Sequence, residues 1–154
     1  MTGHRTMKTL IDLAVGDTFE QSEWLTVSQD MITQFADATG DYQWIHLDEA
    51  RCAKESPFKT TIAHGFLSAS LMPNAFAQVI GQSEKIASTI NYGMDKLRFL
   101  EPVRRDDAIR YQFEVTDISE KPQGKLYKVE ASCILKSSGK PALVGVFLML
   151  AVLA

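Results

Sequence analysis

The stretch HGFLSASLMPNAFAQVIGQ, residues 64–82, is apolar or small on nearly every side of a helical wheel. A helix with so little polar surface does not lie on the outside of a protein, because its apolar faces need cover from other elements. Pro73 stands inside the stretch, where a proline removes one backbone hydrogen bond or kinks the helix. The pattern predicts a long central helix with a defect at Pro73, closed by Gly81.

The residues after this helix predict strands. Apolar and polar side chains alternate along 87–103, 108–120 and 125–138, and the apolar run ALVGVFLMLAVLA at 142–154 follows a turn at 138–141. That run is shorter than the roughly 20 residues that a membrane-spanning helix needs. A strand buried on both faces is the favoured interpretation, and no membrane association is expected.

The residues before the helix complete the fold class. A short entry element at 10–16 and a strand at 18–27 are expected, followed by a helix that begins after Ser28 as its N-cap and ends at Gly40. A short polar helix then runs toward Pro57, which breaks it. Strands and one buried helix predict an α+β domain, a curved antiparallel sheet wrapped around the central helix. Residues 10–154 form this domain, and residues 1–9 are expected to be a flexible tail.

Composition narrows the class of function. At 154 residues the chain has the length of one domain. Its net charge of −3 argues against nucleic acid as a main partner, because proteins that bind nucleic acid usually carry excess positive charge. The two cysteines, Cys52 and Cys133, lack metal-motif spacing and are expected to be free thiols. The polar N-terminus carries no secretory signal, so a cytoplasmic protein is expected.

The motif GDYQWIH at 40–46 places a carboxylate, Asp41, five residues before an imidazole, His46. One interpretation is a surface turn with an incidental histidine, since aspartate is common in turns. The other is an acid/base pair that handles a water molecule, because neutral imidazole is a suitable base near pH 7. Within one helix the two side chains would diverge, so they can converge only if Gly40 releases the chain into a turn.

Three separated segments carry a family resemblance: GDYQWIH, then LDEARCA, then TIAHGFLSASL. Together they resemble the MaoC-like dehydratases and (R)-specific enoyl-CoA hydratases, whose pattern is Gly-Asp-x-Asn-Pro-x-His with a later Ala-His-Gly. The segment NYGMDKLRFLEPV and the replacement of Asn-Pro by Gln43 and Trp44 look most similar to the NodN-like branch. The resemblance implies a single hot-dog fold.

The resemblance also implies an activity. In the family the aspartate and histidine at the positions of Asp41 and His46 hold water beside the double bond of a trans-2-enoyl thioester. The backbone amide at the position of Gly65 polarises the thioester carbonyl. The product is an (R)-3-hydroxyacyl thioester, which makes such a protein a lyase of fatty acid metabolism. The family uses no metal or redox cofactor, since coenzyme A is part of the substrate, and it works as a homodimer or a larger assembly. The substrate is expected to be an acyl-CoA or an acyl-carrier-protein thioester.

Further residues are candidates for substrate contact. Gln43 can form a polar wall, because its amide both donates and accepts hydrogen bonds, and Trp44 replaces a turn-setting proline beside it. His64 is assigned to the helix entrance, where it anchors or caps the helix; a second base is the alternative. Phe66 is core or acyl-tunnel lining. Arg98 belongs to a basic cluster with Lys96, Arg104 and Arg105 that either is solvated or attracts coenzyme A phosphates.

A metal site and two other functions are the alternatives to this assignment. A metal held by Asp41, His46 and His64 lacks the expected ligand spacing, so no metal is predicted. A hot-dog thioesterase would use a carboxylate on or near the central helix, and residues 65–80 contain no Asp or Glu. A non-catalytic acyl-thioester binder is favoured only by the departures at Gln43 and Trp44.

Overall fold

The computed structural model of the chain describes residues 7–154. The described part has one 3₁₀ helix, five α-helices and six strands. In chain order these elements are η1 (Leu10–Asp12), β1 (Thr18–Glu20), β2 (Leu25–Thr26), α1 (Gln29–Thr39), α2 (Trp44–Leu47), α3 (Glu49–Glu55), α4 (Gly65–Ser70), α5 (Met72–Val79), β3 (Ile86–Phe99), β4 (Ala108–Lys121), β5 (Gly124–Leu135) and β6 (Pro141–Leu153).

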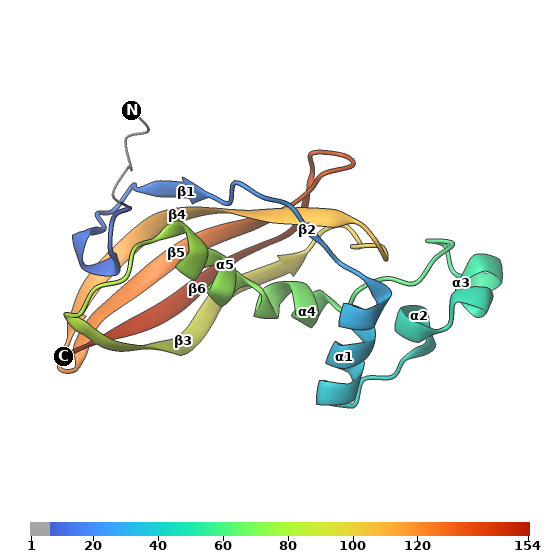
Figure 1. The fold of residues 1–154 in the computed structure, drawn as a ribbon, viewed down its shortest axis with the longest axis horizontal. Helices are drawn as coiled ribbons and strands as arrows, with labels where there is room; N and C mark the ends of the chain where they lie inside the picture. Colours follow the sequence, from blue (N-terminus) through green and yellow to red (C-terminus); the bar gives the residue numbers. More distant parts are fainter. Residues whose placement is uncertain (1–6) are drawn as a thin grey trace.

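The strands form one antiparallel sheet in the order β1-β4-β5-β6-β3, with β2 also paired to β4. Figure 1 shows the sheet curving behind α4 and α5, while α1, α2 and α3 gather beyond one end of the strands. The predicted α+β architecture, a curved sheet around a central helix, is confirmed. The strands predicted from alternation at 108–120 and 125–138, and from the apolar run at 142–154, are also found.

Aromatic contacts attach the central helix to the sheet. Phe76 of α5 is 1% exposed and makes edge-to-face contacts with Phe19 of β1, Phe113 of β4 and Phe147 of β6. Such pairs stabilise the packing beyond the area that they bury. The helix therefore sits on the face of the sheet that carries the inward-pointing residues of β4 and β6.

The central helix differs in detail from the expected one. It breaks at Leu71, so α4 and α5 are separate segments, and Pro73 stands in the first turn of α5, where its missing N–H costs nothing. A break in the central helix is confirmed, and it falls at Leu71, two residues before Pro73. The helix ends at Val79 with Ile80 as an extended C-cap rather than at Gly81, whose N–H instead donates to the carbonyl of Lys8.

Two other expectations change near the N-terminus. The strand expected at 18–27 is two short strands, β1 and β2, because the chain leaves the sheet edge between them. Thr9 forms a bridge with Gly81, so the chain joins the fold before residue 10. The predicted tail at 1–9 otherwise falls largely outside the described residues.

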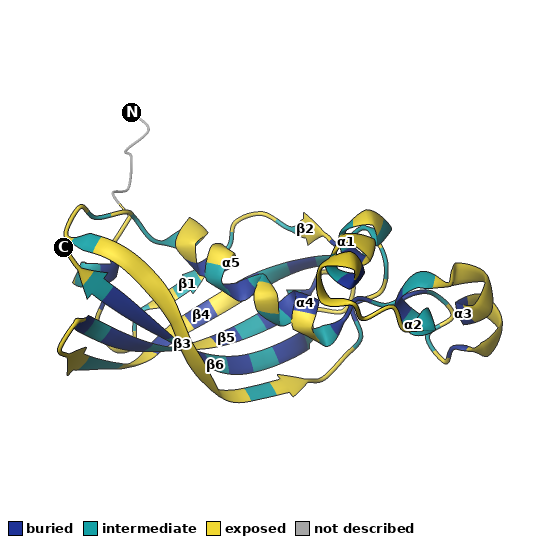
Figure 2. Cartoon of the chain, turned by 90° about the horizontal axis from the view of Figure 1, so that it is seen from below, coloured by how far each residue is buried: buried dark blue, intermediate teal, exposed yellow. Residues whose placement is uncertain are grey.

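Strand β3 is the exposed edge of the sheet. It pairs only with β6, and Figure 2 shows it exposed along most of its length. Ile90, Tyr92 and Met94 are 47%, 55% and 39% exposed, although alternation is typical of a strand with one buried face. Among residues 7–154, no helix combines the length and apolar character that crossing a membrane takes.

Candidate active site

The motif at 40–46 bends in the way that the acid/base hypothesis requires. Helix α1 is capped by the Ser28 hydroxyl, which accepts from Met31 N–H, and it ends at Gly40 with φ of 80°. That left-handed conformation suits glycine, which has no Cβ to clash. The chain then turns and forms α2, an unpredicted single turn that carries His46. One side-chain atom each from Asp41, His46 and His64 lies within 4.8 Å of the other two, so the acid and the imidazole do converge.

His46 is buried, at 6% exposure, and its ring has a defined orientation. The Nδ1–H donates to the carbonyl oxygen of Ile62 at 2.7 Å. Because a carbonyl only accepts, the neutral ring carries its proton on Nδ1 and keeps a lone pair on Nε2. Burial lowers the pKa of His46 below its usual 6.5, and the nearby His64 lowers it further, while the Ile62 hydrogen bond and Asp41 act in the opposite direction. Neutral His46 is therefore a base ready to accept a proton near pH 7.

Asp41 is the exposed member of the pair. One carboxylate oxygen accepts the backbone N–H of Gln43 at 3.3 Å, which shapes the turn between α1 and α2. The backbone carbonyl of Asp41 accepts a hydrogen bond from Nε2–H of His64 at 3.0 Å. The carboxylate thus faces solvent beside a buried imidazole, an arrangement that can hold a water molecule.

A buried polar network behind His46 was not anticipated. The Nε2 of Gln29, at the start of α1, donates to the carbonyl of His46 at 2.9 Å, and the buried hydroxyl of Thr61 donates to the Gln29 side-chain oxygen at 2.6 Å. Thr61 directly precedes Ile62, the acceptor for the His46 ring. Gln29 therefore links the backbone of His46 to the residue that precedes its acceptor, Ile62. A glutamine at a helix start gives no signal of this role in the sequence.

Gly65 begins α4 immediately after His64. Among the residues described, no acceptor is found for its N–H, as expected in the first turn of a helix. A Cβ at this position would lie 2.8 Å from the ring of Phe99, so packing against β3 also requires glycine here. A cavity of about 430 Å³ opens beside it, lined by apolar side chains that include Phe66, Phe99 and Leu143.

The predicted substrate-contact residues do not all meet. Phe66 lies beside Gly65, contacts Phe99 edge-to-face and is 64% exposed. Trp44 stacks under the guanidinium of Arg51 at 4.0 Å, which turns it into part of the α2–α3 surface. Gln43 is exposed in the turn. Arg98 pairs in register with Val144 and neighbours Phe99, whose ring meets the helix, so its side chain belongs to the opposite face of the sheet.

Two polar residues of the central helix, Ser70 and Asn74, could have supported the Asp41 side chain, but no hydrogen bond links them to it. The hydroxyl of Ser70 donates to the carbonyl of Phe66 within α4. Asn74 is exposed on α5. Neither interaction brings a side chain to Asp41.

The three-residue cluster fits a metal poorly. Nδ1 of His46 and Nε2 of His64 already donate to backbone carbonyls. The two rings stack with planes 23° apart, so their remaining lone pairs point along nearly parallel planes instead of converging on one ion. The arrangement suits proton transfer better than tetrahedral coordination.

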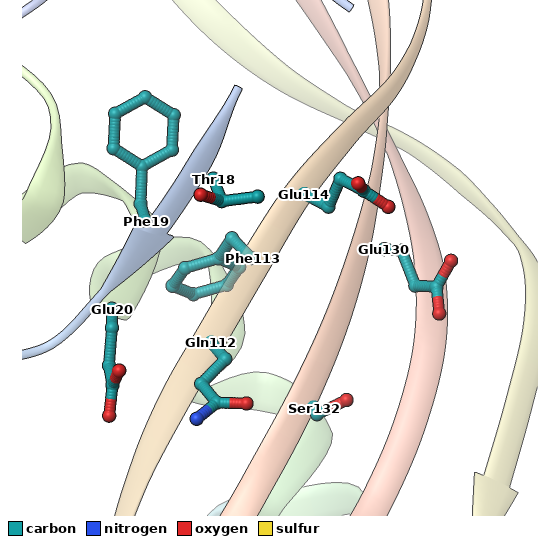
Figure 3. Close-up of a pocket in the computed structure, with 8 residues that line it drawn as sticks. All are labelled: Thr18, Phe19, Glu20, Gln112, Phe113, Glu114, Glu130 and Ser132. Atoms are coloured by element: carbon teal, nitrogen blue, oxygen red, sulfur yellow. The ribbon is translucent and has the colours of Figure 1, made fainter. Parts of the chain in front are cut away.

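A second groove lies on the other face of the sheet, away from the imidazoles. It has a volume of about 430 Å³ and is lined by residues of β1, β4 and β5, among them the carboxylates of Glu20, Glu114 and Glu130 (Figure 3). No histidine or cysteine lines it. The candidate active site is therefore the cluster at the start of α4.

Known proteins resemble this chain in sequence. A MaoC-like domain model matches residues 11–136. The 3-hydroxyacyl-thioester dehydratase Z of Mycobacterium tuberculosis is 37% identical over 143 residues, which cover 91% of this chain and 93% of the relative. Nodulation protein N of Rhizobium leguminosarum bv. viciae is 36% identical and covers 84% of this chain and 81% of the relative.

Solved structures agree with these relatives. The R-hydratase PhaJ1 of Pseudomonas aeruginosa superposes with a TM-score of 0.76 at 28% identity, covering 94% of this chain and 86% of that one. The (R)-hydratase of A. caviae superposes with a TM-score of 0.73 at 25% identity, covering 90% and 97%. By the extent of the domain match and the identity to its relatives, the chain belongs to the MaoC-like dehydratase family and has its hot-dog fold.

Proposed function

We propose that the protein is an (R)-specific enoyl-thioester hydratase, or 3-hydroxyacyl-thioester dehydratase in the reverse direction. The observation that carries the proposal is His46, a buried imidazole oriented by Ile62 with a ring nitrogen within 4.8 Å of a carboxylate oxygen of Asp41. Relatives named for this chemistry support it, among them the dehydratase Z and the PhaJ1 hydratase.

The chemistry follows from the positions of these groups. Nε2 of His46 removes a proton from a water molecule, and the water oxygen forms a bond to C3 of the enoyl thioester. The electron pair of the C2–C3 double bond moves toward the thioester carbonyl, and C2 then gains a proton. Asp41 orients the water and can take part in returning that proton. The N–H of Gly65 is the donor for the developing negative charge on the carbonyl oxygen.

We propose that the reaction needs no metal or redox cofactor, and that coenzyme A, or an acyl-carrier protein, enters only as part of the substrate. The stacking of the two imidazoles supports this, because their remaining ring nitrogens do not converge on one ion. With this activity, we propose that the protein works in the cytoplasm, in fatty acid metabolism. Arg98 as a contact for coenzyme A phosphates stays a prediction that binding to an Arg98→Ala variant tests.

We further propose that the working unit is a homodimer paired through β3. An unpaired edge strand of 14 residues with exposed apolar side chains is a template for another strand. A second copy would cover Ile90, Tyr92 and Met94 and close the open side of the central helix. A second copy of the chain is therefore the partner that the exposed apolar edge of β3 favours.

The hydratase assignment is tested with purified protein and crotonyl-CoA or a longer homologue, following the loss of conjugated-enoyl absorbance. Asp41→Asn and His46→Ala should each reduce the rate by about a hundredfold or more, because each removes a group needed to activate water. Asp30→Asn, an exposed acid in the first turn of α1, serves as the matched control. Rates near wild type in both site variants would refute the assignment.

Two other outcomes would select the alternative functions. Release of free thiol from acyl-CoA would select a thioesterase, against which the absence of Asp and Glu from Gly65–Val79 argues. Calorimetric binding of acyl-CoA without turnover at any chain length would select a non-catalytic binder.

A further inference from the structure

Three aromatic rings form a column behind the candidate site. The ring of His64 stacks on His46 with centroids 3.8 Å apart, and Phe35 of α1 lies against His64 at 4.9 Å. His64 is 3% exposed and Phe35 is half-buried, so the middle ring of the column is shielded from solvent. The column joins α1, α2 and the start of α4, three elements that hold the site.

His64 also holds the acid. Its Nε2–H donates to the backbone carbonyl of Asp41 at 3.0 Å, across 23 residues of sequence. It directly precedes Gly65, the proposed donor to the thioester carbonyl. The His64 imidazole thus contacts both the Asp41 backbone and the His46 ring, and His64 is the residue directly before Gly65.

Fold stability alone does not account for an imidazole here. Nδ1 of His64 is buried and has no hydrogen-bond partner, which is unfavourable in a protein interior. The side chain does not cap α4, since it makes no hydrogen bond to the helix N–H groups. A phenylalanine would fill the same place between Phe35 and His46 without burying an unpaired nitrogen.

We propose that His64 is a positioning residue, which fixes the distance and angle between the Asp41 carboxylate and the His46 imidazole. This inference rests on the proposed hydratase function. The other hydrogen bonds of Asp41 are local: its exposed carboxylate accepts the Gln43 N–H, and its own N–H donates to the Thr39 hydroxyl, each at 3.3 Å. Among the described residues, the His64 bond is therefore the one that ties Asp41 to a distant part of the chain. Without the His64 bond, the acid moves relative to a base that Ile62 and Gln29 still hold.

Two substitutions separate the contacts of His64. His64→Phe keeps a ring in the column and loses the hydrogen bond to Asp41. His64→Gln keeps an N–H donor near the position of Nε2 and loses the ring. A displacement of about 1 Å costs on the order of a hundredfold in rate, so we expect kcat to fall by about tenfold to a hundredfold in His64→Phe, with less loss in His64→Gln and KM within about twofold in both. Ser70→Ala, in the same helix, is the control and should match wild type.

A double-mutant cycle tests whether His64 acts through Asp41. In an Asp41→Asn background, His64→Phe should have much less effect than in wild type, because no carboxylate remains to be positioned. Single-turnover measurements with enzyme in excess keep the slow variants measurable. Multiplicative effects, a raised KM with unchanged kcat, or an unchanged kcat in His64→Phe would each overturn the proposal.

Hydrogen exchange tests the same inference without enzyme activity. In His64→Phe the peptide covering 40–46 should exchange faster, while a peptide from β5 should be unchanged and the urea midpoint retained. Unchanged exchange in 40–46 would overturn the positioning role. If the wild-type protein has no hydratase activity, the proposed function is refuted, but the hydrogen-exchange result for residues 40–46 still tests the contact between His64 and Asp41.

Discussion

Replacing Gly65 with alanine tests how the helix start and β3 form the site together. The added methyl would lie 2.8, 2.9 and 3.0 Å from three ring atoms of Phe99. Since ordinary contact begins at 3.4 Å, the ring has to withdraw by about 0.6 Å. Phe99 is 48% exposed, so it can move.

The stability and the activity of Gly65→Ala should respond differently. Alanine is favoured over glycine in helices by roughly 1 kcal/mol, which offsets much of the cost of moving the ring. The free energy of unfolding should therefore change by less than about 1 kcal/mol. The ring, however, lines the cavity beside Gly65, so its shift should lower kcat/KM by about tenfold, equivalent to about 1.4 kcal/mol of transition-state stabilisation.

The assay compares enoyl-CoA hydration and urea unfolding in Gly65→Ala, Phe99→Leu and the double variant. Phe99→Leu shortens the side chain that the methyl meets, so the double variant should recover most of the activity that Gly65→Ala loses. If the two losses simply multiply, the methyl acts on the backbone donor and not through the ring. A fully active Gly65→Ala would refute the close packing of Phe99 on the helix start.

Three further predictions concern other parts of the chain. The value of kcat/KM should stay level between about pH 8 and about pH 6.5 and decrease at lower pH. Burial lowers the pKa of His46, so the imidazole gains a proton and stops acting as a base only in that lower range. A decrease that begins above pH 7 would contradict this. Tyr92→Lys should turn a dimer into a monomer in analytical ultracentrifugation, because it places a charge on the exposed edge strand, whereas an unchanged mass would exclude β3 as the interface. Tyr111→Phe should lower the free energy of unfolding by about 1–3 kcal/mol in urea, because the Tyr111 hydroxyl donates to the carbonyl of Ser68 near the break of the central helix and its removal leaves that carbonyl unpaired. An unchanged urea midpoint would contradict this.

The sequence by itself determined the local structure of this protein. Ser28 and Gly40 bound α1 because capping and left-handed turns depend on the residue and its near neighbours. Alternation placed β4 and β5 because a strand buries every second side chain, and the continuous apolar run at 142–154 placed β6 as a strand covered on both faces. The motif at 40–46 pointed to an acid and a base, and Gly40 supplied the bend that their convergence required.

The tertiary structure decided how those local elements become a site. The tautomer of His46 depends on Ile62, the support of its backbone on Gln29, and the place of Asp41 on His64. These contacts join segments 16 to 23 residues apart, and side chains that far apart in the chain leave no periodic signal. The sequence also did not predict the exposure of β3, because its alternation resembles that of a buried strand. Only its position at the edge of the sheet leaves it exposed.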